Sequence, residues 1–287
     1  MRTKALIIPS LTLAAGLAAC GGTDEPNNTN NNNTGTQTQA VTLKFAAQVA
    51  GADFVCGQTY AGLGTRSSTL TANDFRFYVS EVALVDAAGN AAPVTLTQDG
   101  KWQYEDVALL DFEDGCGGAG NIDLRSTVEG EVAAGDYTGV RFTLGVPFDK
   151  NHQEAATAPA PLNLTAMFWN WNGGYKFLRV DGGAAGIPGW RLHLGSTTCD
   201  GDGAGHVSTC GEPNRPVVTL SSFDAATDTI VMDLAEVVAD VDLTNDTTGS
   251  PGCMSAPNDM ECAGYFKALG LPFGAQAAVE QTAFMVK

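Results

Sequence analysis

Apolar and polar residues alternate with period two through most of the chain after residue 40. Leu43, Phe45, Ala47 and Val49 would line one face of a first strand, because successive side chains of a strand point to opposite faces of its sheet. Similar segments, separated by Gly, Asn, Asp and Pro, predict further strands. Their residues are 75–85, 107–112, 140–144, 163–171, 175–180, 190–194, 217–220 and 229–234. Helical periodicity is weak, and only residues 263–271 favour a short helix.

The spacing of these strands predicts an all-β fold, an antiparallel β-sandwich with long loops. The chain contains 34 glycines, which suit the many turns of such a fold. Residues 41–287 show neither a linker-like change in composition nor a strict internal repeat. About 250 residues suffice for one large core or two small ones. The simpler interpretation is one disulfide-stabilised β domain over residues 41–287.

The N-terminus has the pattern of a bacterial lipoprotein signal. Two basic residues precede an apolar stretch that is too short to span a bilayer, which is typical of a cleaved signal peptide over residues 1–19. The stretch ends in Leu-Ala-Ala-Cys, which resembles the lipobox, so we expect Cys20 to be lipidated. The alternative is an ordinary signal peptide followed by an incidental cysteine. Gly21 stands where an aspartate commonly signals inner-membrane retention. The sequence therefore favours an outer-membrane lipoprotein that faces the periplasm or the cell surface.

Composition separates a spacer from the domain and excludes one class of partner. Residues 20–40 are rich in Asn and Thr and contain almost no apolar side chains, so they cannot bury enough surface to offset the entropy of ordering. We expect a flexible linker there. The formal net charge of −17 opposes nucleic-acid binding, which needs a basic surface. No later apolar run reaches spanning length, so contact with the membrane would come from the lipid anchor alone.

The chain has seven cysteines, one of which belongs to the lipobox. The other six are Cys56, Cys116, Cys199, Cys210, Cys253 and Cys262. An even number in an oxidising compartment predicts three disulfides, for which fifteen connectivities exist. Short loops favour Cys199 with Cys210 and Cys253 with Cys262, which leaves the first two cysteines to pair with each other. A zinc site built from four cysteines is the alternative, but the C-x-x-C spacing of such sites is absent.

Three histidines and an aromatic stretch over residues 167–177 could carry chemistry. His152 follows a predicted strand, His193 lies on another, and His206 lies between two cysteines. Alternation would put Trp169 and Trp171 on one face. Taken singly, the histidines are best interpreted as surface or hydrogen-bonded residues and the tryptophans as a core stripe. The motifs G-x-S-x-G, H-E-x-x-H and G-x-x-x-x-G-K-[ST] are absent, and we expect a protein that is not an enzyme.

Several short motifs occur in an order that is similar to a known family. They are FVCG at 54–57, DFRFYVS at 74–80, LLDF at 109–112, GVPF at 145–148, NH at 151–152, GYKF at 174–177, HLGS at 193–196 and CM at 253–254. Over nearly all of residues 41–270 the chain resembles the MbnP-like family, also described as the four-cysteine member of a metallo-mystery pair. The resemblance implies copper binding in the periplasm or at the cell surface. It also implies a di-haem partner, similar to MauG and bacterial cytochrome c peroxidases, which oxidises a tryptophan to kynurenine.

The resemblance further implies which residues form the copper site. His152 and His193 would be ligands, and either Trp169 or Trp171 would become the kynurenine beside them. Imidazole suits copper, and Cu(I) accepts few ligands; kynurenine offers an aromatic amine and a carbonyl where indole offers neither. His206 lies outside the matching motifs and is not expected to bind. The four family cysteines correspond to the last four of this chain.

Two other functions stay open at this point. In the first, the chain is a structural or adhesive surface lipoprotein whose aromatic stripe is core and whose histidines are incidental. In the second, it is a copper enzyme with an open coordination position and a substrate pocket. A neighbouring gene for a di-haem cytochrome would favour copper binding over the structural function, and redox turnover of a small substrate would favour the enzyme.

Replacing Cys20 tests the predicted anchor. Cys20→Ser should move the protein from the membrane fraction to the soluble fraction, because the linker and the acidic domain have no other affinity for lipid. Fractionation of cells that produce each form, followed by immunoblotting, measures the distribution. Continued membrane association of the variant would contradict the lipid anchor.

Overall fold

The structure is a computed structural model that describes residues 37–116, 118, 120–170, 172–247 and 251–287. These residues belong to one compact unit. The predicted signal peptide, Cys20, most of the predicted linker and Trp171 lie outside the described residues. Within the described part of the chain, no helix is both long enough and apolar enough to cross a bilayer.

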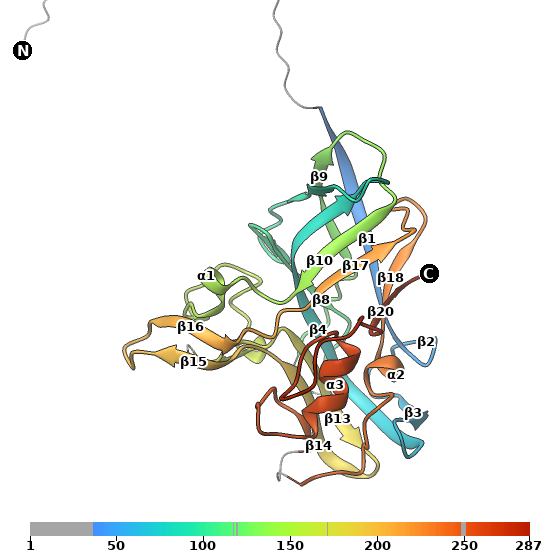
Figure 1. Ribbon diagram of the computed structural model, residues 1–287, viewed down its shortest axis with the longest axis vertical. Coiled ribbons are helices and arrows are strands. Elements are labelled where there is room, and N and C mark those ends of the chain that lie inside the picture. Colours follow the sequence, from blue (N-terminus) through green and yellow to red (C-terminus); the bar gives the residue numbers. More distant parts are fainter. Residues whose placement is uncertain (1–36, 117, 119, 171, 248–250) are drawn as a thin grey trace, which may run out of the picture. The chain divides into compact units, whose positions relative to one another are not determined.

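Two β-sheets form the body of this unit (Figure 1). Across the first sheet the strands are β20 (Phe284–Val286), β18 (Thr229–Asp233), β1 (Thr38–Val49), β9 (Thr127–Ala133) and β6 (Thr95–Leu96), with β2 (Ala52–Asp53) paired to β1. Across the second they are β17 (Val217–Ser221), β10 (Gly139–Leu144), β4 (Ser68–Val85), β13 (Leu178–Ala184), β14 (Ile187–Leu194) and β19 (Gly252–Cys253). The long β4 also pairs with β3 (Thr59–Leu63), β5 (Ala91–Pro93) and β8 (Val107–Asp111), and β8 pairs with β7 (Gln103–Tyr104).

Two small hairpins and four short helices complete the unit. The hairpins are β11 (Phe168–Asn170) with β12 (Gly174–Tyr175), and β15 (Thr197–Gly201) with β16 (Val207–Glu212). The helices are α1 (Phe148–Asn151), the 3-10 helix η1 (Thr165–Met167), α2 (Leu234–Val237) and α3 (Cys262–Ala268). The β15–β16 hairpin projects from the sandwich on the same side as α1 (Figure 1).

The hydrophobic core lies between the sheets and is filled by alternate residues of their strands. Burial alternates along β1 from Val41 to Val49, as the sequence predicts. The ring of Phe45 makes edge-to-face contacts with Phe77 of β4 and Phe142 of β10, with centroids 6.3 Å and 5.6 Å apart, a favourable arrangement for aromatic pairs. The prediction of an all-β, sandwich-like fold is confirmed.

The structure departs from the predicted pairing in two places. Strand β18 runs parallel to β1, and β19 runs parallel to β14. The sheets are therefore mixed rather than antiparallel throughout. Both parallel strands are reached by long connections, which parallel pairing requires.

The predicted strand over residues 163–171 is wrong. Its first part is the helix η1, where the Met167 N–H donates to the Leu164 carbonyl at 2.9 Å, and only β11 is extended. The β11–β12 register also shifts between Phe168 and Asn170, so the period-two pattern does not hold across the aromatic stretch. The predicted strand over residues 175–180 is likewise divided between β12 and β13.

All three predicted disulfides are present. Cys199–Cys210 joins the two strands of the β15–β16 hairpin, and Cys253–Cys262 joins β19 to α3. Cys56–Cys116 links segments 60 residues apart in the sequence. None of these cysteines is therefore a zinc-binding thiolate, and the alternative of a four-cysteine zinc site is excluded.

A buried ion cluster lies on the face of β4 opposite the hydrophobic core. The Arg76 side chain is only 1% exposed; it donates to the carboxylate of Asp74 and lies 3.6 Å from a carboxylate oxygen of Glu113. The Glu113 carboxylate accepts hydrogen bonds from the backbone N–H groups of Gly115 and Asn121. The loop that carries these residues is tied down by Cys56–Cys116. This disulfide thus holds the segment that covers a buried guanidinium.

Asp111, beside this cluster, gives the fold a pH-dependent stability. Burial raises its pKa from the usual 3.8 to about 7. Between these pH values the unfolded chain releases the proton and the folded chain keeps it, so stability falls as the pH rises through this window. Asparagine does not titrate, so the free energy of unfolding of Asp111→Asn, relative to that of the wild type, should rise by a few kcal/mol as the pH goes from about 4 to about 8. Urea unfolding of both proteins at both pH values measures this change. A difference between the two free energies of unfolding that is the same at both pH values would contradict the raised pKa.

Candidate metal centre

Three adjacent strands of the second sheet, β4, β13 and β14, carry polar side chains on the face that points away from the hydrophobic core. In β4, β13 and β14, apolar residues alternate with charged ones, so one face packs in the core and the other carries the ions. The strand register places Asp181 opposite Asp74 and Arg179 opposite both Arg76 and His193. Backbone pairing therefore gathers the charged side chains of three separate segments.

His193 is the buried end of this polar face. It is 4% exposed, and its Nε2 atom lies 2.6 Å from Oδ1 of Asp181. Its Nδ1 atom is buried and has no hydrogen-bond partner among the described residues. Burial lowers the pKa of His193 below its usual value, despite the opposing effect of Asp181. Burial thus favours the neutral imidazole, which is the form that binds metals.

Asp181 is held as a carboxylate by two neighbours. Burial by itself would raise its pKa, but the hydrogen bond from His193 and the charge of Arg179 outweigh that effect and keep the pKa well below its usual value. Arg179 donates through both Nε, at 2.9 Å, and Nη2, at 2.6 Å, to Oδ2 of Asp181. The sequence analysis missed Asp181. The sequence pattern that could have identified it is the alternation of charged and apolar residues, which recurs in Asp74-Phe75-Arg76-Phe77, Arg179-Val180-Asp181 and Arg191-Leu192-His193-Leu194.

Trp169 contacts His193 from the β11–β12 hairpin. The ring centroids are 6.2 Å apart and the ring planes are tilted by 51°. The indole Nε1 is buried and, like Nδ1 of His193, lacks a hydrogen-bond partner within the described part of the chain. Trp190 differs, since its Nε1 donates to the hydroxyl of Tyr265 at 3.1 Å. The structure therefore brings together two of the four predicted site residues, each with an unpaired ring nitrogen.

Glycines leave the room that the Trp169 ring occupies. A Cβ atom at Gly195 would lie 2.4 Å from Cζ3 of Trp169, and one at Gly173 would lie 3.4 Å from its Cε3. Gly195 follows directly on β14, and Ser255 fixes its backbone: the Ser255 hydroxyl donates to the His193 carbonyl at 2.9 Å and accepts from the Gly195 N–H at 3.1 Å. The backbone that carries His193 is therefore the surface against which the indole packs.

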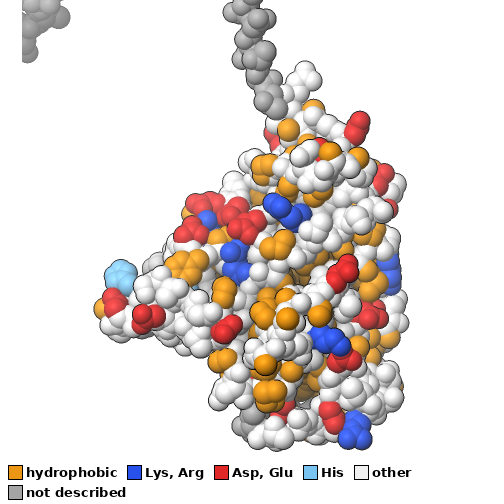
Figure 2. Space-filling model, in the orientation of Figure 1, with side chains coloured by type: hydrophobic (Ala, Val, Ile, Leu, Met, Phe, Trp, Pro, Cys, Tyr) orange, Lys and Arg blue, Asp and Glu red, His pale blue; other side chains and the backbone are white. Residues whose placement is uncertain are grey.

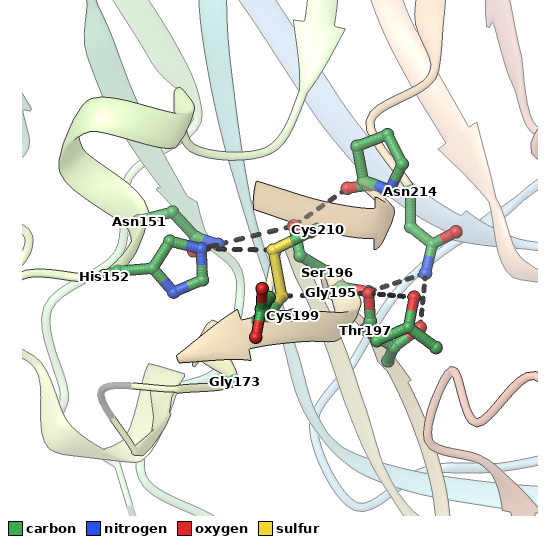
Figure 3. Close-up of a disulfide and its surroundings, with 12 residues drawn as sticks. Asn151, His152, Gly173, Gly195, Ser196, Thr197, Cys199, Cys210 and Asn214 are labelled. Carbon is green, nitrogen blue, oxygen red and sulfur yellow. Dashed lines mark hydrogen bonds between the residues drawn. A yellow bond between two sulfur atoms is a disulfide. The ribbon is translucent and has the colours of Figure 1, made fainter. Parts of the chain in front are cut away.

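His152 lies at the end of α1 beside the β15–β16 hairpin (Figure 3). Its Nε2 atom is 3.4 Å from Sγ of Cys210. The neighbouring Asn151 side chain donates to the Ser196 hydroxyl at 3.4 Å and accepts from the Tyr175 N–H at 2.8 Å. Asn151 thus connects α1 both to the end of β14 and to the hairpin that carries Trp169.

A pocket of about 430 Å³ opens beside the Trp169 ring. Cys199, Met254 and Ser196 also line it. His152 lies against the disulfide whose Cys199 borders this pocket, and the potential donor atoms of His152, Cys199 and Cys210 lie within 4.8 Å of one another. Because both sulfurs form the disulfide, they offer no thiolate to a metal. Met254, which is partly exposed, offers the pocket a soft thioether.

The other predicted residues fall outside this centre. Trp171 lies outside the described residues. His206 is exposed in the turn between β15 and β16. On the face drawn in Figure 2, Lys and Arg side chains are scattered and form no continuous basic surface.

Comparisons with known proteins identify relatives of this chain. A sequence model described as MbnP matches residues 38–255. Among solved structures, "MbnP from Methylosinus trichosporium" is similar, with 32% sequence identity and a TM-score of 0.75. The match covers 87% of this chain and 98% of that one. A comparison with curated proteins finds no match.

Gly195→Ala tests the packing of Trp169. The new methyl group would overlap the indole and the Tyr175 carbonyl oxygen, which lies 2.8 Å from the position of the Cβ atom. The free energy of unfolding should fall by about 1–3 kcal/mol, measured by urea unfolding. Gly173→Ala is the matched control, since its methyl group would make an ordinary contact with the other part of the same ring. Equal effects of the two substitutions would contradict the described packing.

Proposed function

The chain belongs to the MbnP family, as its motifs predict, and from this premise we propose that it is an extracytoplasmic lipoprotein that binds copper. The family is associated with methanobactin-related copper metabolism. In this proposal copper is cargo to be sequestered or carried, and the protein is a binder rather than an enzyme. Its lipid would hold it in the bacterial cell envelope.

The observation that carries the proposal is the pair of unpaired nitrogens on the contacting rings of His193 and Trp169. A buried polar atom without a partner costs about 1–3 kcal/mol, so native structures contain few of them. A neutral imidazole nitrogen with a free lone pair is a copper ligand. The two atoms fit a site that is completed by a bound ion and by a change in the indole.

Indole itself is a poor ligand, because its N–H is only a donor. Oxidation to kynurenine inserts two oxygen atoms across the bond between the two pyrrole carbons and breaks that bond. Two molecules of peroxide, reduced to water at a di-haem partner, would supply the oxygens and accept the four electrons. Hydrolysis of the formyl group as formate then leaves an aromatic amine at the former Nε1 and a ketone. The side chain of Trp169 would thereby gain two atoms that can bind a metal, the amine nitrogen and the ketone oxygen, where the indole had none.

His152 would complete the donor set at the border of the pocket. The disulfide against its ring and the hydrogen bonds of Asn151 hold it next to the segments that carry Trp169 and Ser196. Copper supplies the soft, readily dehydrated cation that imidazole and an aromatic amine favour. The protein's own part is to hold His152 at the border of the pocket and His193 in its buried position beside Trp169.

Single substitutions of the histidines test the copper site. His152→Ala and His193→Ala should each weaken copper binding by at least about tenfold, because a site with few ligands cannot lose one without a large effect. His206→Ala is the control and should bind as the wild type does. Competition titration with a chromogenic copper chelator measures the three affinities. Normal binding by both ligand variants would contradict this copper site and leave the two histidines as structural residues.

Mass spectrometry tests the tryptophan modification. Protein from cells that contain the di-haem partner should yield a peptide in which Trp169 has lost one carbon atom and gained one oxygen atom. Protein made without the partner should keep the indole and bind copper more weakly. An unmodified Trp169 in the first sample, with Trp171 modified in its place, would transfer the role to that residue. Two intact indoles with full copper affinity would refute the proposal.

A further inference from the structure

We propose that Asp181 is a positioning residue of the copper site, which holds His193 as the Nε2–H tautomer and so presents Nδ1 as the ligand atom. This inference rests on the copper-binding function proposed above. It adds to that function the identity of the binding nitrogen and the side chain that selects it.

The choice of tautomer follows from the 2.6 Å contact between Nε2 of His193 and Oδ1 of Asp181. A carboxylate can only accept hydrogen bonds, so the proton of the contact must be on Nε2. A neutral imidazole has one N–H, and Nδ1 therefore keeps its lone pair. This is the nitrogen that has no hydrogen-bond partner among the described residues, and it belongs to the ring that contacts Trp169.

Arg179 prevents the Asp181 carboxylate from turning away. Its two hydrogen bonds occupy Oδ2, which leaves Oδ1 for the histidine. The remaining terminal nitrogen of Arg179, Nη1, donates to the Ala166 carbonyl at 2.8 Å. Ala166 lies three residues before Trp169, so one guanidinium orients both the carboxylate behind His193 and the segment that delivers the tryptophan.

Lys176 strengthens the same connection. Its Nζ atom donates to the Ala166 carbonyl at 2.8 Å, beside the bond from Arg179. Behind Arg179, an oxygen of Asp74 lies 3.2 Å from Nε, and Asp74 is in turn paired with Arg76. Among these carboxylates, Asp181 is the one that contacts His193, whereas Asp74 is a neighbour of Arg179.

A carboxylate in this position has a general effect on a metal-binding histidine. It fixes the orientation of the ring and makes the far nitrogen a stronger base. Loss of such a partner typically weakens metal binding by about 10–100-fold, although the partner never touches the metal.

Asp181→Asn is the decisive variant because a carboxylate accepts hydrogen bonds on both of its oxygens, whereas an amide has one oxygen that accepts and one NH₂ group that donates. The Nε and Nη2 groups of Arg179, which donate to Oδ2 of Asp181, should donate to the amide oxygen of the variant. The NH₂ group then faces His193. Nε2 must then accept, and the proton moves to Nδ1. Nitrogen-15 NMR of the metal-free protein should show the Nε2–H tautomer of His193 in the wild type and the Nδ1–H tautomer in the variant. Copper affinity of the variant should fall by about 10–100-fold.

Asp74→Asn is the matched control. It removes a buried carboxylate from the same ion cluster, and its hydrogen bonds go to Arg76 rather than to His193. A purely structural role for these carboxylates predicts that both variants change the site alike. The proposal predicts that Asp74→Asn keeps the wild-type tautomer even where it lowers the melting temperature, because Asp181 retains its contacts with Arg179 and His193.

Several results would overturn the inference. They are an Nδ1–H tautomer in the wild type, an unchanged tautomer in Asp181→Asn, or a changed tautomer with unchanged copper affinity. The NMR measurement needs no copper, so it decides the positioning role independently. Wild-type protein that bears the expected tautomer but binds no copper would refute the proposed function and leave the role of Asp181 in setting the tautomer intact.

Discussion

The buried guanidinium of Arg76 is the constraint on which much of this structure depends. A charge that is 1% exposed must be surrounded by partners, because removing one partner of a buried ion pair costs about 3–5 kcal/mol. Here the partners are Asp74 from the same strand and Glu113 from a following loop. Asp74 also pairs with Arg179 of β13, which in turn pairs with Asp181. Strand order, loop position and register must all be correct before these charges are paired. The cluster therefore favours a single arrangement of β4, β13 and β14, and His193 stands at its end.

The three disulfides each secure one part of the molecule around this arrangement. Cys56–Cys116 holds the loop that covers Arg76. Cys199–Cys210 closes the hairpin against which His152 lies. Cys253–Cys262 anchors the segment from which Ser255 bonds to the backbone on both sides of Leu194. The site thus depends on covalent links at its periphery and on an ion cluster at its base, while the described part of the hairpin that carries Trp169 is held by hydrogen bonds and ring contacts.

The sequence predicts the parts of this molecule that depend on local pattern. Alternation identifies β1 and β4, and loop length identifies the disulfides of the last four cysteines. It fails for residues 163–171, because their conformation is set by distant donors: Lys176 and Arg179 both bond to the Ala166 carbonyl. The same limit applies to the site. His193 is recognisable as a strand residue, but its link to Asp181 follows from the pairing of β13 with β14, and no spacing in the sequence reports that register.

A stable scaffold can tolerate a few unsatisfied groups, and the place where it does so indicates where function lies. Trp190 is fully buried, yet its N–H reaches Tyr265. Trp169 is less buried, borders a pocket, and has no such partner among the residues described. An unpaired N–H is a cost in the unmodified chain, whereas in the proposed modification an amine at that position would be an advantage once a cation is bound. The same atom would thus be unfavourable before the proposed modification and useful after it. A scaffold that served such a modified state would have to hold the ring in place without pairing its nitrogen, and the glycines around Trp169 leave room for the ring in that arrangement.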